Sequence, residues 1–108
     1  MQDRIRENSS GKLTVHADID LKDLISQFFL DWQEEIKSMR DALGKGDHET
    51  IRILGHNMKG TAGACGFDAV TDMGARIEVA AKQKDNDTIQ ETLDTLASYF
   101  DQVEIIYE

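Results

Sequence analysis

The chain has 108 residues, of which 40% are hydrophobic and 31% are charged, and its formal net charge at pH 7 is -9. This length suits one domain with one hydrophobic core, and the composition excludes the class of chains too poor in apolar residues to fold. The negative charge disfavours nucleic acid and anionic membrane surfaces as partners, because no basic patch stands apart from the acidic residues.

Cysteine content and hydropathy give an expected location. The single cysteine, Cys65, has no second cysteine for an internal disulfide, so nothing requires an oxidising compartment. The sequence contains no basic leader followed by an apolar stretch and no apolar run of roughly 18 residues. We therefore expect a cytoplasmic protein.

Residues 1–19 form a distinct N-terminal segment. Residues 7–11 have the composition of a linker, and residues 13–17 are too short and weakly periodic to assign to an element. We expect residues 1–19 to be an extended or partly disordered arm, or the remnant of a connection to another domain. The remaining residues, 20–108, are expected to form one domain.

Within residues 20–108, apolar residues recur every three or four positions and proline is absent, which predicts helices. The first helix is expected at 20–44, with Asp20 as its N-cap and Gly44 near its end. The second is expected from an Asp47 cap to about residue 65, ended by Gly66.

The third helix is expected at about 68–84, where residues 85–87 interrupt the pattern. The fourth begins at Asp87, with Gln90 in the position of a capping box, and reaches nearly to the C-terminus. Short links between amphipathic helices favour an all-α fold, an antiparallel up-and-down four-helix bundle. Its expected core is Leu21, Leu24, Ile25, Phe28, Trp32, Ile36, Met39, Leu43, Ile51, Leu54, Met58, Ala62, Cys65, Val70, Met73, Ile77, Ala80, Ala81, Ile89, Leu93, Leu96, Phe100 and Val103.

His56 is expected on the outer side of the second helix. At about 100° per residue, the core residues Leu54 and Met58 each lie about 160° from His56 around the helix axis. The residues within about 60° of it are instead charged or lack side chains. They are Glu49, Arg52, Lys59, Gly60 and Gly63.

Two glycines on the outer side suggest space for another molecule. Glycine within a helix costs roughly 0.5–1 kcal/mol relative to alanine. The second helix contains Gly55, Gly60 and Gly63, and close helix packing could account for one of them. Because Gly60 and Gly63 share the side of His56, we interpret them as leaving room for a partner.

An exposed neutral imidazole is a nucleophile near pH 7, and covalent intermediates on histidine are an established route of catalysis. Lys59 lies one turn from His56, and its ammonium can meet an anionic group carried by the ring. A phosphoryl group, with a charge of about -1.5 to -2, suits this pair better than a neutral substrate does.

The sequence resembles the histidine-containing phosphotransfer (HPt) family of bacterial multistep phosphorelays. The family pattern of His, two residues, Lys-Gly, five residues and Gly is matched by His56, Lys59, Gly60 and Gly66. The likeness covers roughly residues 20–106. It also extends through Phe67, Met73, Gly74, Ile77 and Glu78.

The resemblance implies roles for three of the matched residues, while Gly66 marks the turn after the helix. His56 carries the phosphoryl group on Nε2, Lys59 orients or neutralises it, and Gly60, together with Gly63, permits close approach of a receiver domain. The implied partners are response-regulator receiver domains and a sensor or hybrid histidine kinase. The chain is expected to be a monomeric carrier that binds no cofactor, because the acceptor aspartate and the magnesium ion belong to the receiver.

Two other functions remain open at this stage. The chain is also compatible with a phosphoacceptor domain from a larger chemotaxis-type or hybrid kinase, because it contains no nucleotide-binding glycine loop of its own. A third alternative is a noncatalytic helical interaction module that uses the exposed helix face to bind protein. Whether it is an enzyme in its own right is left undecided.

The remaining candidates have ordinary interpretations. His16 and His48 are expected to be surface residues. Glu78 could be functional, but a solvated or helix-pairing carboxylate is the preferred interpretation. A metal site from His48, Glu49 and His56 is disfavoured, because eight residues separate the imidazoles by two helical turns. Phe29 and Ile53 form a possible docking patch, with packing between helices as the alternative.

Overall fold

The computed structural model describes residues 5–7 and 13–108 and places most of them in helices. In chain order the elements are β1 (Ile5–Glu7), β2 (Leu13–Ala17), η1 (Ile19–Leu21), α1 (Lys22–Gly44), α2 (His48–Cys65), α3 (Asp68–Lys82), α4 (Asn86–Gln102) and β3 (Val103–Tyr107). The expectations for residues 1–4 and 8–12 lie outside the described residues.

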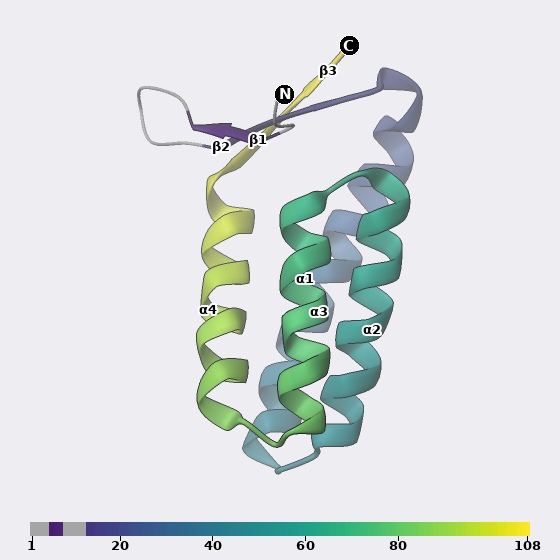
Figure 1. Ribbon diagram of the computed structural model, residues 1–108. Coiled ribbons are helices and arrows are strands. Elements are labelled where there is room, and N and C mark those ends of the chain that lie inside the picture. The colour runs from purple at the N-terminus through teal and green to yellow at the C-terminus, as the bar shows by residue number, and fades with distance from the viewer. Residues whose placement is uncertain (1–4, 8–12) are drawn as a thin grey trace.

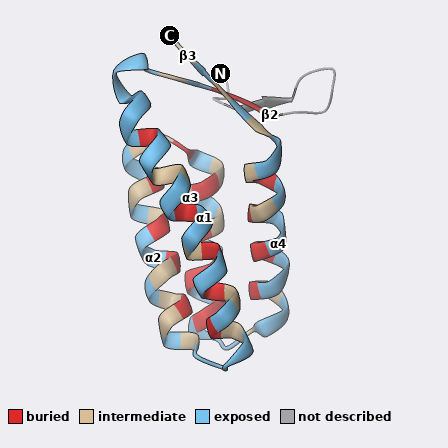
Figure 2. Ribbon diagram, turned by 180° about the vertical axis from the view of Figure 1, so that it is seen from behind, coloured by how far each residue is buried: buried red, intermediate tan, exposed pale blue. Residues whose placement is uncertain are grey.

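The four long helices lie side by side, and the loops that join successive helices are at alternate ends (Figure 1). α1 contacts α2 and α4, and α3 contacts the same two helices. The buried residues lie on the surfaces that the helices turn toward one another, and the outer surfaces are exposed (Figure 2). The expected arrangement of four amphipathic helices around one core is therefore present.

Aromatic residues fill one end of the core. Trp32 of α1 is fully buried and packs edge-on against Phe67, which precedes α3, and stacks on Phe100 of α4. Its indole nitrogen donates a 2.8 Å hydrogen bond to Thr61 Oγ1 of α2. Burying one large apolar side chain contributes roughly 1.5–3 kcal/mol, so these contacts tie the four helices together near the sheet.

Both ends of α2 are as expected. The Asp47 side chain accepts a 3.1 Å hydrogen bond from the Thr50 amide at the N-terminus of α2. Gly66 follows the helix with φ of 78°, a left-handed conformation that favours glycine.

Two other expected caps were wrong. Asp20 lies inside the short helix η1, which is capped instead by the Asp18 side chain accepting from the Asp20 amide. α4 is capped by Asp85 rather than Asp87, because Asp85 accepts a hydrogen bond from the Thr88 amide three residues later. α3 ends at Lys82, two residues before the expected end. Lys84, in the short link before the Asp85 cap, takes a left-handed φ of 55°.

The all-α expectation was incomplete, because β1, β2 and β3 form a three-stranded sheet at one end of the helices (Figure 1). The fourth helix does not reach the C-terminus: it stops at Gln102, and residues 103–107 form β3. These residues are β-branched or aromatic at four of five positions, which favours a strand. β2 pairs with β3 in parallel and with β1 antiparallel.

The segment 13–17, left unassigned from the sequence, is the central strand of this sheet. Its Val15 is buried and belongs to the same core cluster as the helices. Two residues expected in the core, Leu21 and Leu24, are exposed instead, since the buried stripe of α1 starts at Ile25. Among the described residues, no helix has the length and apolar character needed to span a membrane.

Candidate functional site

The His56 imidazole stands on the outer surface of α2, with 61% of its side chain exposed. Its neighbours Met58 and Gly55 on the same helix are buried. The exposed position expected for His56 is therefore confirmed, and the ring is open to a visiting molecule.

Glu78 of α3 holds one nitrogen of this ring. Its Oε2 lies 3.1 Å from His56 Nδ1, and only 10% of the Glu78 side chain is exposed. A carboxylate can only accept a hydrogen bond, so Nδ1 must carry the hydrogen. In the neutral ring Nε2 is then left without a proton, and its lone pair is available as a nucleophile.

Lys59 binds the other oxygen of the same carboxylate. Lys59 Nζ donates a 2.8 Å hydrogen bond to Glu78 Oε1, and Lys82 Nζ lies 4.0 Å from Oε2. The hydrogen bond from Lys59 holds the pKa of Glu78 below its ordinary value, and the charge on Lys59 and the contact with His56 act in the same direction. Glu78 is therefore ionised at neutral pH, as its role as acceptor for Nδ1 requires.

A close crossing of α2 and α3 brings these residues together. A Cβ atom placed on Gly74 would lie 2.9 Å from the backbone nitrogen of Lys59 and 3.0 Å from the carbonyl oxygen of Gly55. A Cβ on Gly55 would in turn lie 3.1 Å from the backbone nitrogen of Glu78. The two glycines therefore let the backbones that carry Lys59 and Glu78 approach until their side chains meet.

Gly60 and Gly63 have no comparable packing requirement. A Cβ on Gly60 would meet no atom within 4 Å, and one on Gly63 would meet only Thr71 Oγ1, at 3.9 Å. Both residues are exposed. The surface beside His56 is thus bare at these two positions, and nothing inside the described chain fills it.

The two residues of the suggested docking patch have different surroundings. Ile53 is 44% exposed on α2. Phe29 is only partly exposed, and its ring contacts Trp32, Phe67 and Phe100. Phe29 thus packs between helices, which was the alternative considered for it. Gly66, the last residue of the matched pattern, follows the C-terminus of α2 and lies away from His56.

The other histidines make local contacts at the surface. His16 Nδ1 lies 2.7 Å from Glu108 Oε2 and joins β2 to the C-terminus, and His48 Nε2 lies 2.6 Å from Asn86 Oδ1 at the start of α4. In the part of the chain that the structure describes, no group of three or more His, Cys, Asp or Glu side chains is arranged to hold a metal ion. Cys65 is partly buried, which raises the pKa of its thiol.

The sequence did not identify Glu78 as a site residue. A functional role was considered but ranked below a solvated or helix-pairing carboxylate. The hydrogen bond to His56 depends on how α2 and α3 cross, which the periodicity of either helix does not reveal. A small residue at position 74, four residues before Glu78, was the available signal.

The arrangement has a clear chemical character: an exposed ring nitrogen with a free lone pair, a carboxylate that fixes the opposite ring nitrogen, and an ammonium beside them. Such a site can attack an electrophile and hold an anionic group on the ring. The chain matches the family model described as Hpt domain over residues 23–105. Comparisons with curated proteins and with solved structures give no match.

Proposed function

The chain belongs to the Hpt domain family, whose role is histidine phosphotransfer in phosphorelays, and we propose that His56 is the residue that carries the phosphoryl group. In this proposal the chain is a carrier: it accepts the phosphoryl group from the aspartate of one receiver domain, or from a kinase, and passes it to the aspartate of another receiver. The hydrogen bond between His56 and Glu78 is the observation that most supports this choice of residue.

The transfer step follows from the state of the ring. The Nε2 lone pair of His56 attacks phosphorus, and the N–P bond forms as the bond between phosphorus and the aspartate oxygen breaks. The aspartate leaves as a carboxylate with the bonding electrons. Nδ1 keeps its hydrogen throughout, so the ring gains positive charge, and the neighbouring Glu78 carboxylate stabilises that charge.

Lys59 has two roles in this proposal. In the free protein it helps to keep Glu78 ionised. When the phosphoryl group arrives, the ammonium of Lys59 lies close enough on the same face of α2 to offset part of its negative charge. Phosphoryl transfer depends mainly on positioning and electrostatic stabilisation, and both are supplied here by fixed neighbours of the ring.

Approach of the receiver requires a surface without protruding side chains. Gly60 and Gly63 supply it beside His56, and Ile53 offers an exposed apolar contact next to it. The receiver brings its own aspartate and the magnesium ion, so the chain itself needs no cofactor. We further propose that the carrier acts as a monomer in the cytoplasm, with receivers and a sensor or hybrid kinase as its partners.

The test is transfer of labelled phosphate from a phosphorylated receiver to the purified chain, with His56→Gln beside the wild type. His16→Gln and His48→Gln are the matched controls, because both residues are surface histidines outside the cluster. We expect label on the wild type and on both controls and none on His56→Gln. Equal labelling of His56→Gln would refute the assignment.

A further inference from the structure

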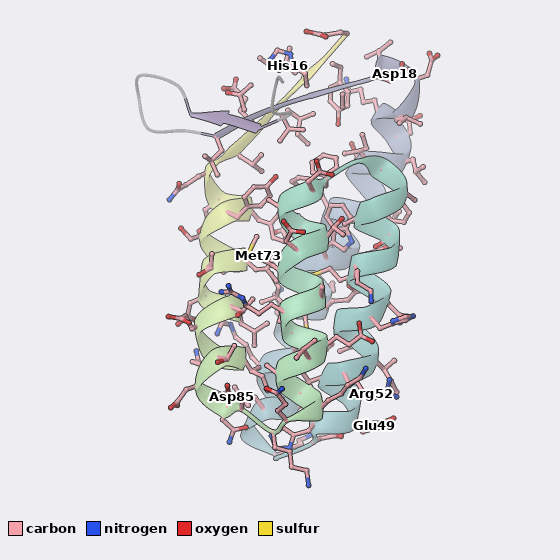
Figure 3. All side chains as sticks on the ribbon, in the orientation of Figure 1. His16, Asp18, Glu49, Arg52, Met73 and Asp85 are labelled. Atoms are coloured by element: carbon pink, nitrogen blue, oxygen red, sulfur yellow. The ribbon has the colours of Figure 1, made fainter. Side chains whose placement is uncertain are left out.

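Arg52 lies one helical turn before His56 on α2, and its guanidinium is paired with Glu49 (Figure 3). Nε donates a 2.9 Å hydrogen bond to Glu49 Oε1, and one terminal nitrogen donates a 2.6 Å hydrogen bond to Oε2. This two-point geometry is the one with which arginine also binds phosphate oxygens. Arg52 therefore already presents the arrangement of donors that a phosphoryl group would take.

The four-residue spacing and the lean of helical side chains bring Arg52 within reach of a phosphoryl group on His56. Side chains on an α-helix lean toward its N-terminus, so the ring of His56 covers the turn that contains Arg52. Nδ1 of His56 faces Glu78 on α3, which leaves Nε2 and any group bound to it on the side away from that carboxylate. Residues four apart on a helix are neighbours, within reach of a long arginine side chain.

Arg52 also belongs electrostatically to the cluster. Its pKa is raised, first by the hydrogen bonds to Glu49 and then by the charges of Glu49 and Glu78. Lys59 stays hydrogen-bonded to the largely buried Glu78 while it offsets part of the phosphoryl charge, whereas the partner of Arg52 is a carboxylate with 67% of its side chain exposed. An exposed ion pair is weak, so Arg52 can exchange Glu49 for a group of higher charge.

We propose that Arg52 is a second phosphoryl-binding residue, which Glu49 occupies in the unphosphorylated protein and releases when His56 carries phosphate. The inference rests on the proposed function of His56. It gives opposite roles to two adjacent charges: Arg52 stabilises the phosphorylated form, and Glu49 competes with it.

The experiment measures the ionisation of the phosphoryl group itself. The chain is phosphorylated with phosphoramidate, which needs no receiver. The background protein carries His16→Gln and His48→Gln, so that His56 is the one remaining histidine of the three in the sequence. The pH titration of the ³¹P resonance is then measured for four proteins. They are this background protein and the same protein with Arg52→Gln, with Glu49→Gln, or with both substitutions. A bound guanidinium favours the dianion, so its loss moves the titration midpoint upward.

We expect Arg52→Gln to raise the midpoint by about half a pH unit and Glu49→Gln to lower it by a smaller amount. In the double variant the effect of Glu49→Gln should disappear, because there is no guanidinium left to release. Lys37→Gln is the control, since Lys37 and Glu34 form an ion pair of the same spacing on α1, and we expect no shift.

Two outcomes contradict the inference. Equal midpoints for the background and Arg52→Gln would show that the guanidinium does not reach the phosphoryl group. An effect of Glu49→Gln that persists unchanged without Arg52 would show that Glu49 acts only as a nearby charge. Neither outcome bears on transfer from a receiver, so a failure of this inference and a failure of the proposed function are distinguishable.

Discussion

Glu78 Oε2 lies 3.1 Å from Nδ1 of His56, across the contact between α3 and α2. Because the carboxylate is ionised and mostly buried, this hydrogen bond selects one ring tautomer and one ring orientation. The tautomer and orientation of the His56 ring therefore depend on two helices rather than on the short motif around the histidine alone.

Replacing Glu78 should separate the orientation of the ring from its charge. Glu78→Ala removes the acceptor for Nδ1, and we expect transfer to slow by roughly ten- to a hundred-fold, by analogy with the loss of a partner that orients a metal-bound imidazole. Glu78→Gln keeps an acceptor oxygen without the charge and should fall between alanine and wild type. Single-turnover transfer from a phosphorylated receiver measures both rates, and wild-type rates for both variants would show that Glu78 is only a packing residue.

Replacing Lys59 should affect transfer more than stability. Lys59→Ala removes one of the neighbours of Glu78, but the pair is partly exposed, so the free energy of unfolding should change by about 1 kcal/mol or less. Transfer should slow by roughly ten-fold or more, since a positive charge is lost beside the reacting group. Lys37→Ala, in an exposed pair on α1, is the control for stability and rate. Transfer as fast as that of Lys37→Ala would remove Lys59 from the site.

The helix crossing gives a matched pair of glycine substitutions. Gly74→Ala forces the new Cβ against the Lys59 backbone, so we expect a loss of about 1–3 kcal/mol in the free energy of unfolding, together with slower transfer as Glu78 moves from His56. Gly60→Ala meets only open space and should stabilise α2 by about 0.5–1 kcal/mol. Denaturant unfolding checks the opposite signs, and a stabilised Gly74→Ala protein would contradict the proposed crossing geometry.

Ionisation of Glu35 on α1 should lower the free energy of unfolding at high pH. Its Oε1 is buried with no hydrogen-bond partner in the described part of the chain, and burial, with the nearby charge of Asp31, raises its pKa to about 7. Because the folded protein holds the Glu35 proton more tightly than the unfolded chain does, Glu35 does not reduce the free energy of unfolding below the ordinary pKa of 4.5. The free energy of unfolding then falls as pH rises from 4.5 through about 7.

Glu35→Gln removes this titration. We expect the variant to be more stable than wild type by about 1–3 kcal/mol at pH 8.5 and to gain much less at pH 5. Thermal or denaturant unfolding at the two pH values measures the difference. The same gain at both would mean that ionisation of Glu35 is not its source.

α2 could be predicted closely because its signals are local. Asp47 and Gly66 mark its ends, and the apolar stripe through Ile51 and Met58 places His56 on the opposite side. The outer position of His56 and the exposed positions 60 and 63 followed from helical periodicity alone.

The missed features depend on contacts between segments far apart in the chain. β3 pairs with β2, about 90 residues earlier, and the apolar residues at 103, 105 and 107 fit a strand only once that partner is present. Phe100 and Val103 also fit a helical spacing, so the sequence alone favoured one long helix. Glu78 was underrated for a similar reason, since its partners lie on α2.

The most direct test is to identify the ring nitrogen that bears the phosphoryl group, by long-range ¹H–¹⁵N NMR of the phosphorylated, histidine-labelled protein. Phosphorylation by a receiver should give one modified imidazole, that of His56, with phosphorus on Nε2 and hydrogen on Nδ1. Phosphorus on Nδ1, or on His16 or His48, would contradict the arrangement in which Glu78 holds one nitrogen of His56 and leaves the other free.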